Sequence, residues 1–297
     1  MTKLATVTLS NPDRVLYPGM GLTKSDLAEY YRAIAPLMMP HVINRPVSLV
    51  RCPQGRQRKC FFQRHHVAGF PEHFRSIDLR EASGDDKAYL YIDEPEGLIA
   101  GVQFGVLEFH IWGSTIADLE RPDRLVFDLD PDPELDFAVV RQAAFELASF
   151  IGELSLTSFP MLTGGKGVHV VAPLKPEAEW PEVKSFARSV AGTMAQYAPD
   201  RFVDNMAKAR RKGRIFIDYL RNDRTATAIA PFSTRAREGA PVAWPLSWDQ
   251  FKRATSGADY DVKKAMRAAK RLKSSPWEGH EEARRPLPAG SDIPRAR

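Results

Sequence analysis

The stretch RLVFDLDPDP, residues 124–133, decides the fold and raises the question of function. In a β-strand, successive side chains alternate between two faces. One face of this predicted strand is apolar and carries Leu125, Phe127 and Leu129, whereas the other carries Asp128 and Asp130 side by side. The two carboxylates repel each other, and protonation, water or a divalent cation such as Mg²⁺ or Mn²⁺ relieves the repulsion. A structural role and a metal site explain this motif equally well.

The acidic residues after this strand favour a turn rather than a calcium site. An EF-hand loop would need Gly in place of Pro133 and Glu in place of Val139. Asp132 is instead typical of a helix N-cap, and the apolar periodicity predicts that this helix runs to about Leu154.

A third acid lies in a second apolar strand, FIDYL, where Asp218 stands between Ile217 and Tyr219. Burial of a carboxylate is costly unless it is paired or bound to a metal. If this strand lies beside the first, Asp128, Asp130 and Asp218 could hold two divalent ions about 3.5–4 Å apart. That arrangement activates an attacking oxygen and stabilises a leaving oxygen in phosphoryl or nucleotidyl transfer.

The turn TGGKGVH, residues 163–169, contains groups that would suit a triphosphate. Its glycines let backbone N–H groups approach an anion, Lys166 adds a positive charge, and His169 is a further donor. The pattern is neither a Walker A loop nor a Rossmann fingerprint. The alternative is a tight β-hairpin in which the glycines serve only the turn.

Further candidates are a histidine, a group of arginines and two aromatic residues. His110, in a predicted strand at residues 106–112, is either a core histidine or a metal or phosphate partner. Arginine matches phosphate oxygens in bidentate geometry, and four arginines follow Asp218: Arg221, Arg224, Arg235 and Arg237. Phe61 and Phe62 follow a basic run and either stack on a base or fill the core.

Composition narrows the class of protein. No apolar run is long enough to span a bilayer and the N-terminus lacks a signal-peptide pattern, so a cytoplasmic, nucleoid-associated location and no membrane partner are expected. Cys52 and Cys60 are too few for a disulfide framework, and with His65 and His66 they make at best an irregular zinc set. The net charge is +5, and basic residues cluster at 51–59, 208–214 and 263–273, which suits a polyanion or a solvated face.

The pattern of elements predicts an α+β fold with a mixed, largely antiparallel β-sheet flanked by helices. Thr23 is expected to cap one helix, and residues 182–197 are expected to form another whose buried side includes Tyr197. Residues 273–297 form a polar, Pro-rich tail that is expected to be largely disordered.

Together these segments resemble the polymerase domain of bacterial ligase D, a branch of the archaeo-eukaryotic primase superfamily that acts in non-homologous end joining. The likeness runs through nearly the whole chain, in the order NPDRVLYP, TKSDLAEYYRAIAPLMMPH, RPVSLVR, KCFFQRH, LEFHIWGS, DRLVFDLDP, TGGKGVHVVAPL, FIDYLRN and APFSTRAREGAPV. The resemblance implies a primase-like polymerase domain at residues 1–272. Its DNA-end-binding part would span about residues 1–100 and its catalytic core about residues 101–272.

The resemblance also implies a role for each candidate residue. The catalytic and metal-binding group would be Asp128, Asp130 and Asp218, with His110 as the active-site histidine. The nucleotide-binding group would be Thr163, Lys166, His169, Arg221 and Arg235. The DNA-binding group would be Arg14 and Lys24 for a 5′-phosphate, Phe61 and Phe62 for template bases, and Arg51. Thr163 replaces the Ser that is usual in the family and keeps its hydroxyl, and Arg14 replaces a Lys found in some members and keeps its charge.

The implied function is template-directed addition of nucleotides to a primer 3′-hydroxyl, with a preference for ribonucleotides and for Mn²⁺ (or Mg²⁺), to fill short gaps at double-strand breaks. Its partners would be DNA ends with a 5′-phosphate, nucleoside triphosphates, a Ku-like end-binding protein and a DNA ligase. The chain lacks a K-x-D-G adenylation motif and is not expected to seal nicks. A metal-dependent nuclease and a non-catalytic DNA-end-binding protein are the alternatives, and the triphosphate-like turn favours the polymerase over both.

Overall fold

The computed structural model describes residues 7–81, 84–272 and 274–294, which fall into two compact units. The first unit comprises Met1–Trp112, Ile229–Ala243 and Tyr260–Lys273, and the second comprises Gly113–Ala228, Trp244–Asp259 and Ser274–Arg297. The chain is therefore divided differently from the sequential split expected near residue 100, because two later segments return to the first unit.

The second unit is built on a sheet with the strand order β11-β12-β8-β10-β9-β14. β11 pairs with β12 in parallel, and the other neighbours in this order are antiparallel. The strands are β8 (Arg124–Pro131), β9 (Phe159–Leu162), β10 (Val168–Pro173), β11 (Phe202–Val203), β12 (Ile215–Asp218) and β14 (Trp244–Pro245). This sheet confirms the predicted mixed, largely antiparallel architecture.

The apolar face of β8 anchors the centre of this sheet. Leu125, Phe127 and Leu129 are fully buried, as the alternation predicted. β12 lies directly beside β8, so the condition under which the two acid-bearing strands bring their carboxylates together is met. The strand pattern therefore fixes which face carries the acids.

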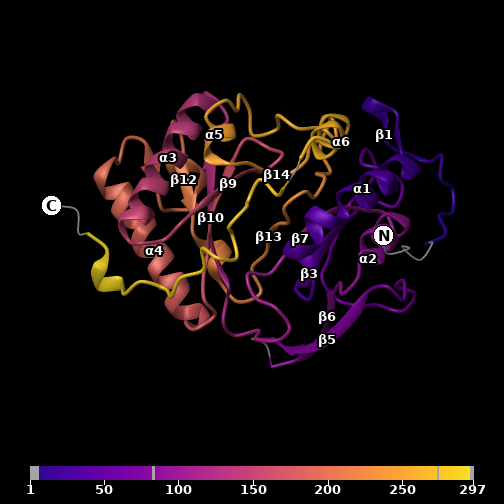
Figure 1. Ribbon diagram of the computed structural model, residues 1–297, viewed down its shortest axis with the longest axis horizontal. Helices are drawn as coiled ribbons and strands as arrows, with labels where there is room; N and C mark the ends of the chain where they lie inside the picture. Colours follow the sequence, from indigo (N-terminus) through magenta and orange to yellow (C-terminus); the bar gives the residue numbers. More distant parts are fainter. Residues whose placement is uncertain (1–6, 82–83, 273, 295–297) are drawn as a thin grey trace. The chain divides into compact units, whose positions relative to one another are not determined.

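Two long helices, α3 (Phe137–Glu153) and α4 (Trp180–Tyr197), pack against this sheet (Figure 1). α3 contacts β10 and β8, and α4 contacts β11 and β8. The predicted cap of α3 is wrong: Asp136, not Asp132, is the N-cap, and its Oδ1 accepts a hydrogen bond from the Ala138 N–H at 2.9 Å. The carboxylate of Asp132 instead accepts from the backbone N–H groups of Glu134 and Gly213. Asp132 therefore shapes the turn that precedes the helix.

The apolar stripe of α4 is confirmed for Val183, Phe186 and Val190, which are buried. Tyr197 differs from the prediction, because it lies in the last turn of the helix and is 75% exposed. None of the helices in the described ranges is long and apolar enough to cross a membrane.

The C-terminal segment is ordered over residues 274–294, contrary to the expected disorder. Trp277 is buried and its Nε1 donates to the Pro160 carbonyl at 2.9 Å, while Arg285 forms a β-bridge with Leu174. The buried Trp277 side chain therefore holds this segment against the rest of the second unit, although most of its residues are polar. Residues 273 and 295–297 of the predicted tail lie outside the described residues. The short helices of the second unit are η2 (Lys208–Arg210), η3 (Leu220–Asn222), α5 (Trp248–Phe251) and η4 (Gly290–Asp292).

The first unit contains a sheet with the order β13-β7-β3-β6-β5, and β4 also pairs with β3. β3 is antiparallel to β4, β6 and β7. The strands are β3 (Pro46–Arg51), β4 (Phe61–Gln63), β5 (Arg75–Arg80), β6 (Asp86–Tyr91), β7 (Val106–Ile111) and β13 (Ala228–Ile229). β1 (Val15–Tyr17) and β2 (Leu22–Thr23) form a small sheet of their own.

The helices of the first unit are η1 (Pro18–Met20), α1 (Lys24–Val42), α2 (Glu96–Gln103) and α6 (Val262–Ala269). α1 packs against both α2 and α6. Its predicted cap is confirmed, because the Thr23 side chain accepts from the Asp26 N–H and the Asp26 carboxylate accepts from the Thr23 N–H. This reciprocal capping box satisfies two of the backbone donors at the start of the helix.

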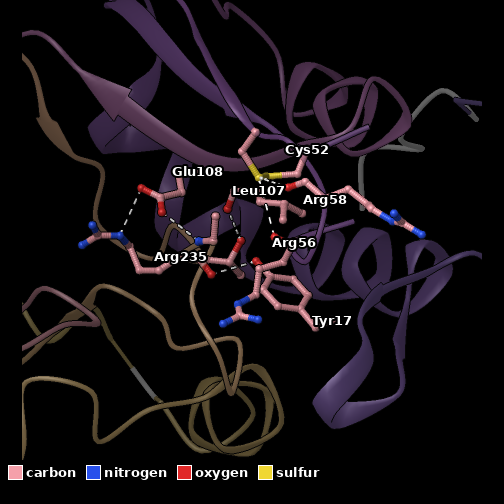
Figure 2. The surroundings of a disulfide bond; sticks show 10 residues. Tyr17, Cys52, Arg56, Arg58, Leu107, Glu108 and Arg235 are labelled. Atoms are coloured by element: carbon pink, nitrogen blue, oxygen red, sulfur yellow. Dashed lines mark hydrogen bonds and ion pairs between the residues drawn. A yellow bond between two sulfur atoms is a disulfide. The ribbon is translucent and has the colours of Figure 1, made fainter. Parts of the chain in front are cut away.

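A disulfide joins Cys52, just after β3, to Cys60, just before β4 (Figure 2). The suggested zinc set with His65 and His66 is therefore wrong, because both cysteine sulfurs are bonded to each other. The bridge ties together the two ends of the basic loop at residues 53–59. The polypeptide that leads into Phe61 is fixed at this point.

Candidate active site

Three neighbouring strands of the second unit bring the predicted acids together. In the antiparallel registers, Asp128 of β8 lies opposite Asp218 of β12 on one side and opposite His169 of β10 on the other. Asp130 follows two positions along β8, on the same face as Asp128. We call Asp128, Asp130 and Asp218 the acid row. Side chains that are directly opposite in this way lie within contact distance.

Two arginines lie against the acid row. The 3₁₀-helix η3 directly follows β12, so Arg221 turns back and its Nη2 lies 3.2 Å from Asp128 Oδ2 and 3.1 Å from Asp218 Oδ2. Arg211 Nη1 lies 2.6 Å from Asp130 Oδ2, and its guanidinium lies over the Phe216 ring. Arg211 was not predicted as a site residue, and the basic run at 208–214 was the only signal for it.

The arginines do not fully compensate the acids. Burial is the largest cause that raises the pKa of Asp218, which is 9% exposed; Arg221 opposes this rise and Asp128 adds to it. Burial and the charge of Asp128 likewise raise the pKa of Asp130, against the effect of Arg211. The row therefore carries negative charge that further positive charge would stabilise.

The donor chemistry of the acid row fits a divalent cation. Carboxylate oxygens are the ligands that Mg²⁺ prefers, and Mn²⁺ suits the same set. In the arrangement that the structure describes, no three His, Cys, Asp or Glu side chains among the described residues are grouped closely enough to hold one ion. Guanidinium groups lie there instead, so a bound cation would replace contacts of Arg221 and Arg211.

The Gly-rich turn joins the antiparallel strands β9 and β10 as a hairpin. A Cβ at Gly167 would lie 2.6 Å from the Leu129 carbonyl oxygen, so only glycine lets the turn approach β8 this closely. Thr163 Oγ1 donates to the Gly167 carbonyl at 2.9 Å. Lys166 is exposed, and its Nζ donates to the Pro133 carbonyl at 2.8 Å, beyond the end of the acid-bearing strand. The glycine at position 167 therefore allows the turn to pack closely on β8, and Lys166 is exposed on this turn.

His110 and Arg235 belong to the first unit, where both bind Glu108. Arg235 Nε lies 3.1 Å from Glu108 Oε2 (Figure 2). His110 Nε2 lies 2.8 Å from the same oxygen, and the Ala236 N–H donates to Oε1 at 2.7 Å. We call Glu108, His110 and Arg235 the glutamate cluster. Glu108 was not predicted; the spacing Glu-x-His on one strand face was the signal available for it.

The electrostatics of the glutamate cluster differ from those of the acid row. Burial alone would raise the pKa of Glu108, but the hydrogen bond with His110 and the charges of Arg235 and His110 lower it to about 2. The carboxylate is therefore ionised at neutral pH and holds both partners in fixed positions.

The two residues expected at a 5′-phosphate lie near the start of α1, in different environments. Lys24 is buried, and its Nζ bonds to the Ser10 carbonyl and to two oxygens of Gln103. Burial and the charge of Arg14 lower the pKa of Lys24. Arg14 is exposed, and its Nη1 donates to the Pro53 carbonyl in the loop closed by the disulfide.

The aromatic pair of β4 is on the surface. Phe61 is 39% and Phe62 is 48% exposed, so the alternative in which they fill the core is wrong. The Arg51 guanidinium lies 4.9 Å from the Phe61 ring centre and 3.5 Å from that of Phe104. Phe62 makes an edge contact with His110. Both Phe61 and Phe62 therefore keep exposed ring surface.

Residues 23–277 match the family described as LigD, primase-polymerase domain. The chain belongs to this family. It is 35% identical over 286 residues to the multifunctional non-homologous end joining protein LigD of Pseudomonas aeruginosa, an alignment that covers 96% of this chain and 34% of that protein. It is 29% identical over 251 residues to the bifunctional non-homologous end joining protein LigD of Bacillus subtilis, which covers 84% of this chain and 40% of that protein.

The fold agrees with a solved structure, the polymerase domain of Mycobacterium tuberculosis ligase D in complex with DNA. The TM-score is 0.86 at 28% identity, and the match covers 97% of this chain and 99% of that one. The primase-polymerase class makes the chain a nucleotidyltransferase. The chain spans about a third of the length of the Pseudomonas relative.

Proposed function

We propose that this chain adds nucleotides to a primer 3′-hydroxyl under the direction of a template and fills short gaps at broken DNA ends. The observation that carries the proposal is the acid row, in which Asp128 faces Asp218 across two paired strands. The names of the relatives, which refer to end joining, support the gap-filling role. We further propose that ribonucleotides are preferred and that Mn²⁺ supports the reaction better than Mg²⁺.

In this proposal the acid row holds the divalent ions. Such ions, when bound, favour the attack of the 3′-oxygen on the α-phosphate and stabilise the departing pyrophosphate. The chain's own task is to hold the carboxylates ionised and aligned, and the paired backbones of β8 and β12 provide that alignment.

The cations near the acid row would bind the triphosphate. Lys166 is exposed on a turn that cannot shift far, because Gly167 packs on the backbone of β8. Arg221, freed from the acids by a bound cation, would direct its N–H groups to phosphate oxygens. His169, 3.6 Å from Asp128, would orient that carboxylate or donate to a phosphate, and Thr163 would keep the turn in shape.

In the first unit, we propose that His110 and Arg235 contact the incoming nucleotide in positions set by Glu108. Phe61 and Phe62 would stack on template bases, a contact worth about 1–3 kcal/mol per base, and Arg51 would support them. Arg14 is the accessible cation for a downstream 5′-phosphate, and Lys24 would fix the backbone on which that site is built. A Ku-like end-binding protein and a DNA ligase are the proposed partners.

The test is extension of a labelled primer across a short 5′-phosphorylated gap, with Mn²⁺ or Mg²⁺ and with ribo- or deoxynucleotides. We expect lengthening with Mn²⁺ and ribonucleotides, and none with Asp128→Ala. Shortening of the labelled strand would favour a nuclease instead. DNA binding without any change in strand length would reduce the chain to an end-binding protein.

A further inference from the structure

Helix α6 carries a basic face that the proposed reaction does not use. Its exposed cations are Lys263, Lys264, Arg267, Lys270 and Arg271. With 3.6 residues per turn they fall within an arc of about 120°, on one side of the helix. Helical hydrogen bonds continue past the last full turn, because the Leu272 N–H donates to the Ala268 carbonyl. We call these five cations the basic face.

The opposite side of α6 fixes the helix in the first unit. Val262 and Ala265 are buried, and the helix packs against α1. Asp261 caps the helix through the Lys264 N–H, and the Val262 N–H donates to the Ala240 carbonyl at 3.1 Å. The basic face is therefore held outward by a rigid support.

The cations of the basic face have no acidic partners among the described residues. Each of the other two basic segments, residues 51–59 and 208–214, contains at least one paired arginine: Arg56 pairs with Glu238, and Arg211 pairs with Asp130. On α6, Arg267 has Lys263 four residues before it and Arg271 four residues after it. Like charges at this spacing repel and weaken a helix.

Helix stability does not explain this arrangement. Cations stabilise the C-terminal end of a helix through its dipole and are unfavourable at the N-terminal end. Lys270 and Arg271 suit the dipole, but Lys263 and Lys264 lie in the first turn, where it opposes them. The basic face therefore concentrates positive charge that stabilises neither the helix nor its packing. Such a concentration is typical of a surface that binds a polyanion.

We propose that the basic face binds the phosphate backbone of duplex DNA and holds the duplex on the polymerase. The inference rests on the proposed function and adds a contact surface to it. Lys263 and Arg271 are eight residues apart, so the face is about 12 Å long, enough to meet several phosphates of one strand.

A duplex fits the face better than a single strand does. Single-stranded nucleic acid is bound by exposed aromatic rings together with cations. The aromatic ring against this face is Tyr260, which is partly buried and lies under the Lys264 ammonium at 4.7 Å. The exposed aromatic side chains Phe61 and Phe62 lie on β4 instead. The basic face therefore offers charge without a stacking surface.

The experiment measures the affinity of a blunt 20-base-pair duplex at several salt concentrations by fluorescence anisotropy. The variant is Lys263→Gln/Arg267→Gln/Lys270→Gln, and the matched control is Lys87→Gln/Lys175→Gln/Arg188→Gln, which removes the same charge from exposed positions elsewhere. If all three cations contact phosphates, the slope of log affinity against log salt becomes shallower by about 2.7, with at least about tenfold weaker binding near 0.1 M salt. The control should keep the parent slope.

A charge-conserving variant, Lys263→Arg/Arg267→Lys/Lys270→Arg, should keep the parent slope and shows that the helix tolerates substitution. Equal slopes for the face variant and the parent would overturn the inference. A loss confined to single-stranded probes would overturn the assignment to duplex. Primer extension by the parent protein is measured separately. If the parent extends the primer but the face variant keeps the parent salt slope, only the proposed role of the basic face is refuted. If the salt slope changes but the parent does not extend the primer, only the proposed polymerase function is refuted.

Discussion

The acid row and the glutamate cluster combine the same kinds of side chain and reach opposite electrostatic states. In the glutamate cluster, one carboxylate receives hydrogen bonds from a histidine, an arginine and a backbone N–H, and the pKa of Glu108 falls to about 2. In the acid row, carboxylates face each other, and the pKa values of Asp130 and Asp218 rise although arginines lie beside them.

The difference shows what each region is built for. The single carboxylate of Glu108 is fully compensated by its hydrogen-bond donors and by the charge of Arg235. Glu108 therefore has a structural role, because it sets the positions of His110 and Arg235. The arginines beside the acid row do not neutralise all of its negative charge, so the acid row can still bind a cation. Functional sites often carry this kind of electrostatic cost, which the rest of the fold must support.

The largest expected effect is on catalysis by the acid row. Asp128→Asn keeps the shape of the side chain but removes the central charge, and primer extension with Mn²⁺ should fall by about a thousandfold or more, because a metal-held transition state loses several kcal/mol. Asp132→Asn is the matched control, since the Asp132 carboxylate lies outside the acid row and accepts hydrogen bonds from the backbone N–H groups of Glu134 and Gly213. Steady-state extension rates check both, and similar losses in the two variants would contradict the account.

The next effect concerns the stability of the glutamate cluster. Glu108→Gln should lower the free energy of unfolding at pH 7 by on the order of 3 kcal/mol, since a lowered pKa stabilises the folded state above the unfolded value. This contribution is lost as the pH falls from about 4.5 toward 2. The gap between parent and variant in urea unfolding should therefore shrink to less than half by about pH 3. A gap that stays constant over this range would show that the charge of Glu108 is not its cause.

The smallest effect has the opposite sign. Because the pKa of Asp218 is raised, its ionised form destabilises the fold above that pKa, and this cost disappears as the pH falls through it. Asp218→Asn should therefore be more stable than the parent at pH 7 in a chelator, while the amide oxygen still accepts from the Leu220 N–H. Thermal unfolding with and without Mn²⁺ checks this, since added Mn²⁺ should stabilise only the parent. If the Asp218→Asn variant is less stable than the parent in chelator, the charge of Asp218 stabilises the fold, as that of Glu108 does, and the account of Asp218 is wrong.

Much of the acid row could be predicted from the sequence. Alternation placed Asp128 and Asp130 on one face, and an apolar strand around Asp218 signalled a costly acid. The register that sets Asp128 opposite Asp218 and His169 could not be predicted, because it depends on the pairing of segments about 90 and 40 residues away in sequence. Arg211 was hidden for the same reason, inside a run of basic residues that looked solvated.

Sequence patterns predicted contacts correctly where both partners are close in sequence. They failed where the partner belongs to a segment that is distant in sequence. Thr23 was predicted as a cap because its partner, Asp26, is three residues away. Trp277 was lost in a polar tail because the Pro160 carbonyl that its indole contacts is distant in sequence. Glu108 was overlooked because Arg235 and Ala236, which complete its environment, lie more than a hundred residues later.

The most direct test of the central claim, that the acid row is a divalent-metal site, is the binding of Mn²⁺ followed by the electron paramagnetic resonance signal of the free ion at pH 7. The parent and Asp132→Asn should bind Mn²⁺ alike, and Asp128→Asn/Asp218→Asn should bind at least about tenfold more weakly, because two of the three carboxylates are removed. Equal binding by the parent and the double variant would contradict the account, since the ion would then be held elsewhere.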